Sequence, residues 1–289
     1  MISVENLSLF NINTFRKLYN KNENTYICDR SFFEFYDKEP FVIKYLIRKQ
    51  IKLFKVKNKY VGYIWYEYPP DQGISNIYAI YIKDEYINFI NSRLLSFFGV
   101  STFKCDMLVN SKASHIMKKL NFNMNSRNIL MNMKVTDLNK NLDESKITFK
   151  HFKEGHDETL RCKIQNSVFN EKNRIPLTVQ DVYNEEEEEY YIKNFGVFIC
   201  KDNGHAIGYG QIIFNKGIYT IVNLGILDKY RKQGYGEMLV IYLIKLCKKH
   251  SIQNIYIRVD NSNSKALSLY SKIGFREYQS FITWYKNIH

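Results

Sequence analysis

The order of hydrophobic and polar positions along this chain predicts a protein built from both helices and strands. Between residues 156 and 169 apolar side chains recur every three to four positions, which is typical of a helix with one buried face. Between residues 255 and 259 apolar and polar side chains alternate, as they do along a strand. The two patterns are interleaved along the whole chain, so we expect an α/β (α+β) fold.

The same patterns place the individual elements. In the first half they predict helices at residues 11–19, 32–36, 40–49, 87–98 and 111–120, and strands at 51–56, 61–68, 77–82, 103–109 and 128–135. In the second half they predict helices at residues 156–169, 179–183 and 237–244, and strands at 147–152, 197–201, 206–214, 219–227, 255–259 and 281–285. An Asp-Asn-Gly turn at 202–204 is expected to join two of these strands into a hairpin, and a second turn is expected at 215–217.

The two halves resemble each other, which indicates a duplicated unit. Residues 110–122 align on residues 263–275 without a gap, and Asn, Ser, Lys, Ala and Phe coincide at matching places. The predicted hairpin around Gly62 and Tyr63 is similar to the one around Gly208 and Tyr209. Self-similarity of this kind favours two domains of one fold over a single large domain. A polar segment at 135–146 separates them, so we predict domains at residues 1–137 and 147–289.

The segment from Asn223 to Gly236 combines an apolar strand, a turn with Arg231, Gly234 and Gly236, and an apolar helix. Glycines let a backbone turn sharply and approach a ligand closely. A helix that begins at such a turn offers unpaired N–H groups and the positive end of its dipole, which suits a phosphate. The glycine spacing differs from that of a Walker A loop and of a Rossmann turn.

This segment resembles the Arg-x-x-Gly-x-Gly signature of the GNAT superfamily of N-acetyltransferases. Asn263-Ser-Lys-Ala-Leu-Ser-Leu-Tyr270, followed by Gly274-Phe275, is similar to a second GNAT segment in the expected order. The resemblance covers roughly residues 147–286. It implies two tandem GNAT-like domains, each a mixed, mostly antiparallel twisted sheet flanked by helices, and an acetyl-CoA site in the second domain.

The resemblance also assigns roles to residues of the second domain. The backbone N–H groups of Lys232, Gln233, Gly234, Tyr235 and Gly236 are expected to bind the pyrophosphate of acetyl-CoA, with Arg231 adding positive charge. The strand residues Leu224, Gly225 and Ile226 are expected to pair with the pantetheine arm and to hold the oxyanion.

Two further residues complete the expected site. Asn263 is expected either to contact the cofactor arm or to cap its own helix. Tyr270 is the expected general acid for the leaving thiolate, with packing against the sheet as the alternative. The general base stays open, because Thr220 and Asn223 cannot accept a proton usefully near neutral pH. A water chain, a carboxylate from the run Glu185–Glu189, or no dedicated base would each be compatible with the sequence.

The glutamate run itself has two interpretations. It is either a solvated helix face, as most charge runs are, or a cluster that attracts a cationic amine.

The first domain lacks these features. The repeat places Ile87, Ile90 and Ser92 where the second domain has its arginine and two glycines, and Met117 where it has a tyrosine. A β-branched side chain is poorly suited to a tight turn around a phosphate. We therefore expect a non-catalytic first domain that pairs with the second as an internal pseudo-dimer.

Composition narrows the function classes. The chain has 45% hydrophobic and 16% aromatic residues, which favours a folded protein over a disordered one. A formal charge of +13 would suit nucleic acid, but the lysines are spread along the chain and no basic stripe stands out, so we expect no nucleic-acid partner. Neither a metal site nor a membrane-spanning segment is expected. The five scattered cysteines favour reduced, mostly buried thiols and a cytoplasmic protein.

The sequence thus predicts an N-acetyltransferase that moves an acetyl group from acetyl-CoA to a primary amine of a small molecule or peptide by direct transfer. An acyl-CoA-binding regulatory or scaffold protein without turnover is the alternative. The identity of the acceptor stays open, because variable loops and the first helices set acceptor specificity in this fold. An acyl group longer than acetyl is also compatible with the sequence.

Overall fold

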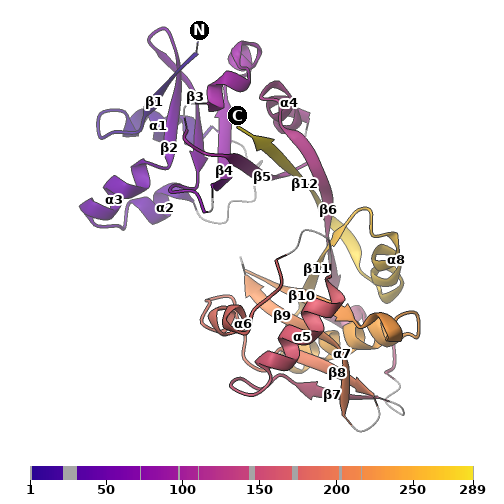
Figure 1. The fold of residues 1–289 in the computed structure, drawn as a ribbon. Helices are drawn as coiled ribbons and strands as arrows, with labels where there is room; N and C mark the ends of the chain where they lie inside the picture. Colours follow the sequence, from indigo (N-terminus) through magenta and orange to yellow (C-terminus); the bar gives the residue numbers. More distant parts are fainter. Residues whose placement is uncertain are drawn as a thin grey trace. The chain divides into compact units, whose positions relative to one another are not determined.

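The computed structural model describes residues 2–21, 31–71, 73–96, 98–109, 111–142, 147–170, 175–201, 204–215 and 217–288. The chain forms two compact units (Figure 1). Unit 1 combines Met1–Asn128 with Gln279–His289, and unit 2 is Ile129–Tyr278. No helix of the described residues is both long and apolar enough to cross a membrane.

Unit 1 contains most of the elements that the first half of the sequence predicts. They are β1 (Ile2–Asn6), α1 (Ile12–Tyr19), α2 (Phe32–Tyr36), α3 (Phe41–Arg48), β2 (Ile51–Val56), β3 (Lys59–Tyr66), β4 (Ile74–Ile82), the 3₁₀ helices η1 (Asp84–Phe89) and η2 (Ser92–Leu95), β5 (Thr102–Leu108) and α4 (Ser111–Lys119). The single helix predicted at 87–98 is wrong, since two short 3₁₀ helices cover this stretch. Ile87, Ile90 and Leu95 are buried in the core there, so the segment follows the packing surface instead of continuing as an α-helix.

Among the described residues, unit 2 has the same order of strands, but it has two helices where unit 1 has three, and the long helix α7 (Tyr235–Lys249) between its fourth and fifth strands. Its elements are η3 (Val135–Asp137), β7 (Ile147–His151), α5 (Glu158–Val168), α6 (Val179–Glu186), β8 (Gly196–Lys201), β9 (His205–Asn215), β10 (Ile218–Ile226), η4 (Asp228–Tyr230), α7, β11 (Asn254–Asp260) and α8 (Ser264–Ile273). Residues 202, 203 and 216 of the two predicted turns, and residues 143–146 of the predicted linker, lie outside the described residues.

The sheets of the two units share one topology, which confirms the predicted fold class. In unit 1 the strand order is β1-β2-β3-β4-β5-β12, and in unit 2 it is β7-β8-β9-β10-β11-β6. In both units the first four strands pair antiparallel and the fifth joins the fourth in parallel.

The sixth strand of each sheet comes from the other repeat. β6 (Asn123–Lys134) ends the first repeat, but its residues from Ile129 onward belong to unit 2. β12 (Arg276–Asn287) ends the second repeat, but from Gln279 onward it belongs to unit 1, where Phe281 pairs with Leu108 of β5. The predicted domains 1–137 and 147–289 therefore do not coincide with the compact units.

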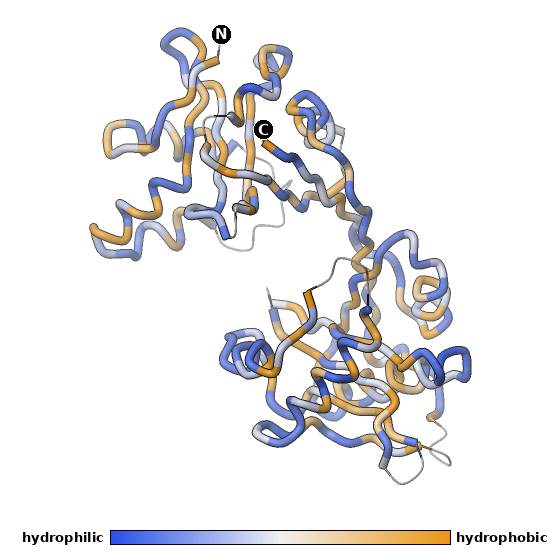
Figure 2. Tube along the Cα trace, viewed as in Figure 1, coloured by the Kyte–Doolittle hydropathy of each residue, from blue (hydrophilic) through white to orange (hydrophobic). Residues whose placement is uncertain are grey.

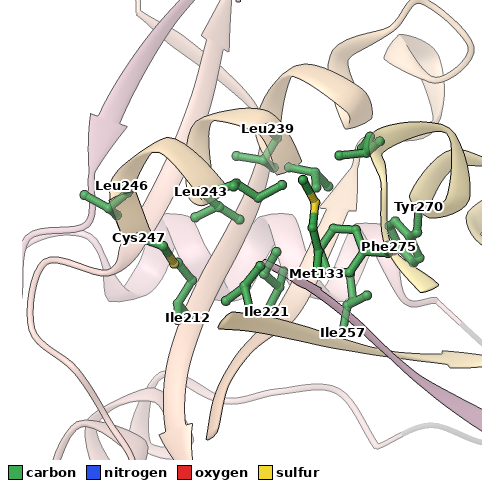
Figure 3. Packing of buried hydrophobic residues seen from close by; sticks show 14 of the residues in the cluster. Met133, Ile212, Ile221, Leu239, Leu243, Leu246, Cys247, Ile257, Tyr270 and Phe275 are labelled. Atoms are coloured by element: carbon green, nitrogen blue, oxygen red, sulfur yellow. The ribbon is translucent and has the colours of Figure 1, made fainter. Parts of the chain in front are cut away.

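Strand alternation explains how helices cover both faces of the sheet in unit 2. On β8, Val197 and Ile199 pack into the cluster with α7 and α8, whereas Phe198 and Cys200 pack into the cluster with α5 and α6. Figure 2 shows hydrophobic and hydrophilic residues interspersed along the chain of both units. Figure 3 shows Leu243 and Cys247 of α7 directed toward the strands that carry Ile212 and Ile221.

The cysteines agree with the prediction of reduced thiols. Cys105, Cys162, Cys200 and Cys247 are buried and unpaired. Cys28 lies outside the described residues.

Candidate functional site

A cleft opens in unit 2 where two neighbouring parallel strands separate. Within the described residues, β10 pairs with β11 at Thr220–Tyr256 and Ile221–Ile257, although both strands continue beyond these pairs. On its other edge β10 pairs with β9, and the register shifts between Val222 and Gly225. Asn223, inside this bulge, has a positive φ of 55°. A bulge strengthens the local twist of a strand, so it turns the end of β10 away from β11.

The cleft between the two strands has a volume of about 220 Å³. Its walls come from β10, β11, α8 and the end of α5. They comprise Phe169, Ile221, Val222, Asn223, Leu224, Ile257, Arg258, Val259, Asp260, Asn263, Ala266 and Tyr270.

The three predicted strand residues have different environments. Leu224 lines the cleft, whereas Ile226 is buried in the core. Gly225 faces α5, where a Cβ on residue 225 would lie 2.1 Å from Cγ1 of Val168. No larger residue fits at 225 while the helix packs this closely.

The predicted turn leads directly into α7. Gly234 caps the helix in the left-handed conformation, with φ of 87°, and Lys232 also has a positive φ of 63°. The first backbone bond of the helix runs from Met238 N to Gly234 O at 3.1 Å, so the preceding N–H groups of Tyr235 and Gly236 have no partner within the helix. An anion placed there would accept these donors at the positive end of the helix dipole.

The guanidinium group of Arg231 is bound by neighbouring groups of unit 2. Its Nε donates to Ile226 O at 2.9 Å and a terminal nitrogen donates to Val168 O at 3.0 Å. The other terminal nitrogen forms an ion pair with Asp228 at 2.8 Å. The side chain thereby fixes the turn to the end of β10 and to the end of α5, a role that the sequence did not predict.

Tyr270 lines the cleft. It is 8% exposed, it lies on α8, and its ring centre is 6.1 Å from that of Phe275. Figure 3 shows these two side chains next to each other. Burial raises the pKa of its hydroxyl to about 12. Among the described residues, no group forms a hydrogen bond with this hydroxyl. A protonated phenol is therefore available to a ligand in the cleft.

Asn263 combines a position at the cleft with a structural role. It lines the cleft, and its side-chain oxygen accepts a hydrogen bond from Ala266 N at 3.1 Å. The alternative in which this residue caps its own helix is therefore observed. Asp260, the acidic residue that lines the cleft, is similarly engaged, because its Oδ1 accepts from Ser262 N at 2.8 Å and Ser262 Oγ at 2.6 Å.

Glu237 is a residue that the sequence reasoning missed. It lies in the first turn of α7 and pairs with Lys140 and Lys272. Hydrogen bonds from these two lysines lower the pKa of its carboxyl group. They join the beginning of α7 to α8 and to the segment that follows β6. An acid in the first turn of a helix is the only signal that could have singled it out.

A second group of polar residues surrounds the contact between α5, α6 and β9. Arg161 of α5 is fully buried, forms an ion pair with Glu185, and lies 5.2 Å from the centre of the Tyr209 ring. Tyr209 donates to Gln211 Oε1 at 3.2 Å, and Asn223 donates to the same oxygen at 3.5 Å. A continuous set of polar groups thus extends from α5 to the cleft.

Several atoms of this polar network lack partners among the described residues. They are Nε and one terminal nitrogen of Arg161, the side-chain nitrogens of Gln165 and Gln211, and one carboxylate oxygen each of Glu154 and Glu186. Burial, followed by the nearby charges of Glu158 and Glu154, raises the pKa of Glu186 to about 7. Buried polar groups normally have partners, so this concentration indicates a place where water or a polar ligand binds.

The glutamate run is therefore divided. Glu187, Glu188 and Glu189 are exposed, as the solvated interpretation predicts, whereas Glu185 and Glu186 belong to the polar network. The periodicity of α5 could have revealed Arg161 and Gln165, which lie one turn apart on its buried side.

Unit 1 has a different arrangement at the corresponding place. Ile87 and Ile90 are buried in its core, in and just after a short 3₁₀ helix, and Met117 is fully buried in the same cluster. A turn that leads into a long helix is not formed between β4 and β5.

Comparisons with known proteins agree with this geometry. The sequence model of the acetyltransferase (GNAT) family matches residues 166–275. The chain is 35% identical over 69 residues to an N-alpha-acetyltransferase 50 from Danio rerio, which covers 24% of this chain and 41% of that protein. It is 36% identical over 78 residues to a ribosomal protein bS18 alanine N-acetyltransferase from Haemophilus influenzae, which covers 26% of this chain and 51% of that protein. The chain therefore spans about half the length of these relatives.

Solved structures resemble the whole chain. A GCN5-related N-acetyltransferase from Sphaerobacter thermophilus superimposes with a TM-score of 0.67 at 15% identity, covering 100% of this chain and 96% of that one. A tandem GNAT protein from the clavulanic acid biosynthesis pathway gives a TM-score of 0.62 at 8% identity, and the superposition covers 100% of this chain and 99% of that one. At these identities the likeness concerns the fold, and it supports the two-domain organisation.

Proposed function

Because residues 166–275 of this chain belong to the acetyltransferase (GNAT) family, we propose that unit 2 transfers an acetyl group from acetyl-CoA to a primary amine. The observation that carries this proposal is the separation of β10 from β11, with Tyr270 in the wall of the resulting cleft. Unpaired strand edges can pair with an extended ligand, and the pantetheine arm of acetyl-CoA is such a ligand.

The turn before α7 supports the binding of the cofactor's pyrophosphate. The free N–H groups of Tyr235 and Gly236 follow a glycine with open space around it, so a phosphate can approach the backbone. The backbone of Lys232, Gln233 and Gly234 completes the proposed phosphate site. Leu224, Gly225 and Ile226 form the proposed contact with the pantetheine arm.

The reaction that fits this arrangement is direct transfer in a ternary complex. The amine nitrogen attacks the thioester carbonyl carbon, so a C–N bond forms while the C–S bond breaks. A backbone N–H of β10 stabilises the negative charge that develops on the carbonyl oxygen. Tyr270 donates its proton to the departing sulfur, and the amine releases a proton to solvent.

The polar network of α5, α6 and β9 is the proposed entry side of the acceptor. It reaches the cleft at Asn223, and it holds the unpartnered carboxylate oxygens of Glu154 and Glu186. Negative charge at this place favours a cationic amine before it is deprotonated for attack. One relative is named an N-alpha-acetyltransferase and another a ribosomal protein bS18 alanine N-acetyltransferase, so we propose the α-amine of a peptide as the first acceptor to test.

Unit 1 is proposed to lack a second acetyl-CoA site of this kind. The residues at the matching positions, Ile87, Ile90 and Met117, are buried in its core. One acetyl-CoA cleft per chain is the expected stoichiometry.

The decisive experiment is a free-thiol release assay with acetyl-CoA and a panel of acceptors: peptides with free and blocked α-amines, polyamines, aminoglycosides and amino acids. We expect thiol release with at least one free amine, and none with the peptides whose amines are blocked. Longer acyl-CoA donors assayed in parallel determine the acyl group. Cofactor binding is measured separately by calorimetry.

One observation favours the second candidate, an acyl-CoA-binding protein without turnover. Asp260 is the one carboxylate among the cleft residues, and it is already bound to Ser262. Tight binding of acetyl-CoA without thiol release for any acceptor would support this candidate and contradict the transferase.

A further inference from the structure

Unit 1 has a cavity of its own, and its lining differs in character from the cleft in unit 2. Its volume is about 640 Å³, within the range of roughly 300–1,000 Å³ that is typical of small-molecule sites. It lies where β1 ends at Asn6 and is lined by residues of α3, β2 and β3 as well. All of its lining residues belong to unit 1.

Three cations line this cavity without acidic partners. Arg48 is 6% exposed, and a terminal nitrogen donates to the hydroxyl of Tyr36 at 2.8 Å. Lys49 and Lys52 lie close to it in sequence, and Lys52 donates to the neutral side chain of Asn6. None of the three forms an ion pair with a carboxylate of the described residues, and no Asp or Glu lines the cavity.

A buried cation without a counter-charge is costly, because removal from water is not offset by attraction to an anion. Burial lowers the pKa of Lys52, which reflects this cost. A ligand with two or more negative charges would supply the missing partners.

Aromatic rings make up much of the remaining lining. Tyr66 and Phe98 are buried, while Phe10 is fully exposed, Tyr45 is 54% exposed and Tyr68 is 42% exposed. Lys49 Nζ lies 5.0 Å from the centre of the Tyr45 ring, so cation and ring are presented together. Exposed aromatic residues gathered at one cavity indicate a surface that packs against a flat, partly apolar partner.

The cavity is not a copy of the acetyl-CoA cleft. Tyr66 ends β3 beside Ile77, near the beginning of β4. The segment that matches the phosphate-binding turn of unit 2 follows the opposite end of β4, after Ile82.

We propose that this cavity binds a nucleoside phosphate, with its phosphates on Arg48, Lys49 and Lys52 and its base against the exposed rings. The three cations match the charge of a diphosphate, and the rings match a planar base. The proposal does not depend on acetyl transfer by unit 2.

The test measures binding of ADP to the full chain by calorimetry, with adenosine and inorganic pyrophosphate as the two partial ligands. We expect ADP to bind more tightly than either, because each lacks one of the two recognised features. A second titration uses Gly234→Ala, in which only the proposed cofactor turn of unit 2 is altered, and we expect its affinity for ADP to be unchanged, since the proposed sites are separate. A loss of ADP affinity in this variant would contradict the proposal.

The matched variants remove equal charge. Lys49→Gln combined with Lys52→Gln is expected to weaken ADP binding about tenfold or more, as the loss of charge-assisted contacts implies. Lys59→Gln combined with Lys118→Gln alters two exposed lysines of the same unit that do not line the cavity, and it is expected to change binding less than about twofold. Tyr45→Ala, at an exposed ring, tests the base contact without disturbing the core.

Three further results would overturn the proposal: no binding of ADP at millimolar concentration, equal weakening by both double variants, or binding of pyrophosphate as tight as that of ADP. Binding of a single-stranded oligonucleotide without binding of ADP would instead identify a nucleic-acid surface. Thermal melting of each variant verifies that it is folded. Because unit 2 is unchanged in these variants, thiol release there reports separately on the proposed acetyl transfer.

Discussion

At the scale of single residues, the hydroxyl of Tyr270 is the group on which the proposed chemistry depends most directly. It is buried, lines the cleft and has no hydrogen-bond partner among the described residues. The packing role that the sequence left as an alternative is also present, since the ring contacts Phe275. Both functions coexist because the ring packs in the core while the residue still borders the cleft.

Tyr270→Phe is expected to lower kcat about 100-fold while the dissociation constant of acetyl-CoA changes less than about twofold, because only the proton donor is removed. Steady-state kinetics and calorimetry give the two values. Tyr278→Phe, at an exposed tyrosine of the same unit, is the control. With a pKa of about 12, Tyr270 stays protonated at lower pH, so it should cause no loss of kcat between pH 7 and 10. Unchanged turnover in the variant would remove Tyr270 from the mechanism.

Glu186 gives a second expectation at this scale, concerning stability and pH. Its pKa is raised from 4.5 to about 7, mainly by burial, so the folded state holds the proton more tightly than the unfolded chain. Between these two pH values the folded state binds more protons, and the free energy of unfolding therefore falls as the pH rises. Glu186→Gln removes this contribution.

The difference obtained by subtracting the urea midpoint of the unchanged protein from that of Glu186→Gln is thus expected to rise between pH 4.5 and 8. Glu187→Gln, at an exposed neighbour, serves as the control and should show no such trend. If the difference in urea midpoint between Glu186→Gln and the unchanged protein is the same at both ends of the pH range, the pKa of Glu186 is not raised as inferred.

At the scale of elements, the turn before α7 depends on backbone conformation more than on side chains. Gly234 has a positive φ and open space around it, so an added Cβ would strain the backbone without a clash. The side chain of Arg231 fixes the same turn through two backbone carbonyls. The sequence predicted this turn correctly because glycine spacing and helix start are local properties of the chain.

Gly234→Ala is expected to destabilise unit 2 by about 1–2 kcal/mol and to weaken acetyl-CoA binding about tenfold. Gly217 is a matched control, since it also has a positive φ and nothing near its Cβ, but it lies in the β9–β10 turn. Gly217→Ala should lose similar stability and keep its affinity for acetyl-CoA. Denaturant unfolding and calorimetry measure the two quantities, and equal loss of affinity in both variants would refute a specific role for the turn.

At the scale of the whole molecule, the exchange of the sixth strands is the main feature that the sequence did not reveal. Trp284 and Ile282 of β12 pack in the core of unit 1, whereas Ile129, Met131 and Met133 of β6 pack in the core of unit 2. Each unit therefore includes a strand that the other repeat contributes.

Trp284→Ala is expected to destabilise unit 1 by about 3–5 kcal/mol, because it creates a cavity in that core. Hydrogen exchange should increase in β4 and β5, while acetyl-CoA still binds to unit 2. Phe275→Ala, at an equally buried residue of unit 2, should give the reverse pattern. Faster exchange in β10 and β11 of the Trp284 variant would mean that β12 belongs to the second domain, as the sequence alone predicted.

The sequence by itself determined the alternation of elements, the repeat, the turn from Arg231 to Gly236 and the motif around Tyr270. These features depend on residues close together in the chain, where period and glycine placement express the local preference directly. Only the tertiary structure decided that β6 and β12 change units, that Arg161 forms a buried ion pair, and that cations and rings line a cavity in unit 1. Such features arise from packing between residues far apart in the chain, and the free energy of that packing leaves no periodic signal in the sequence.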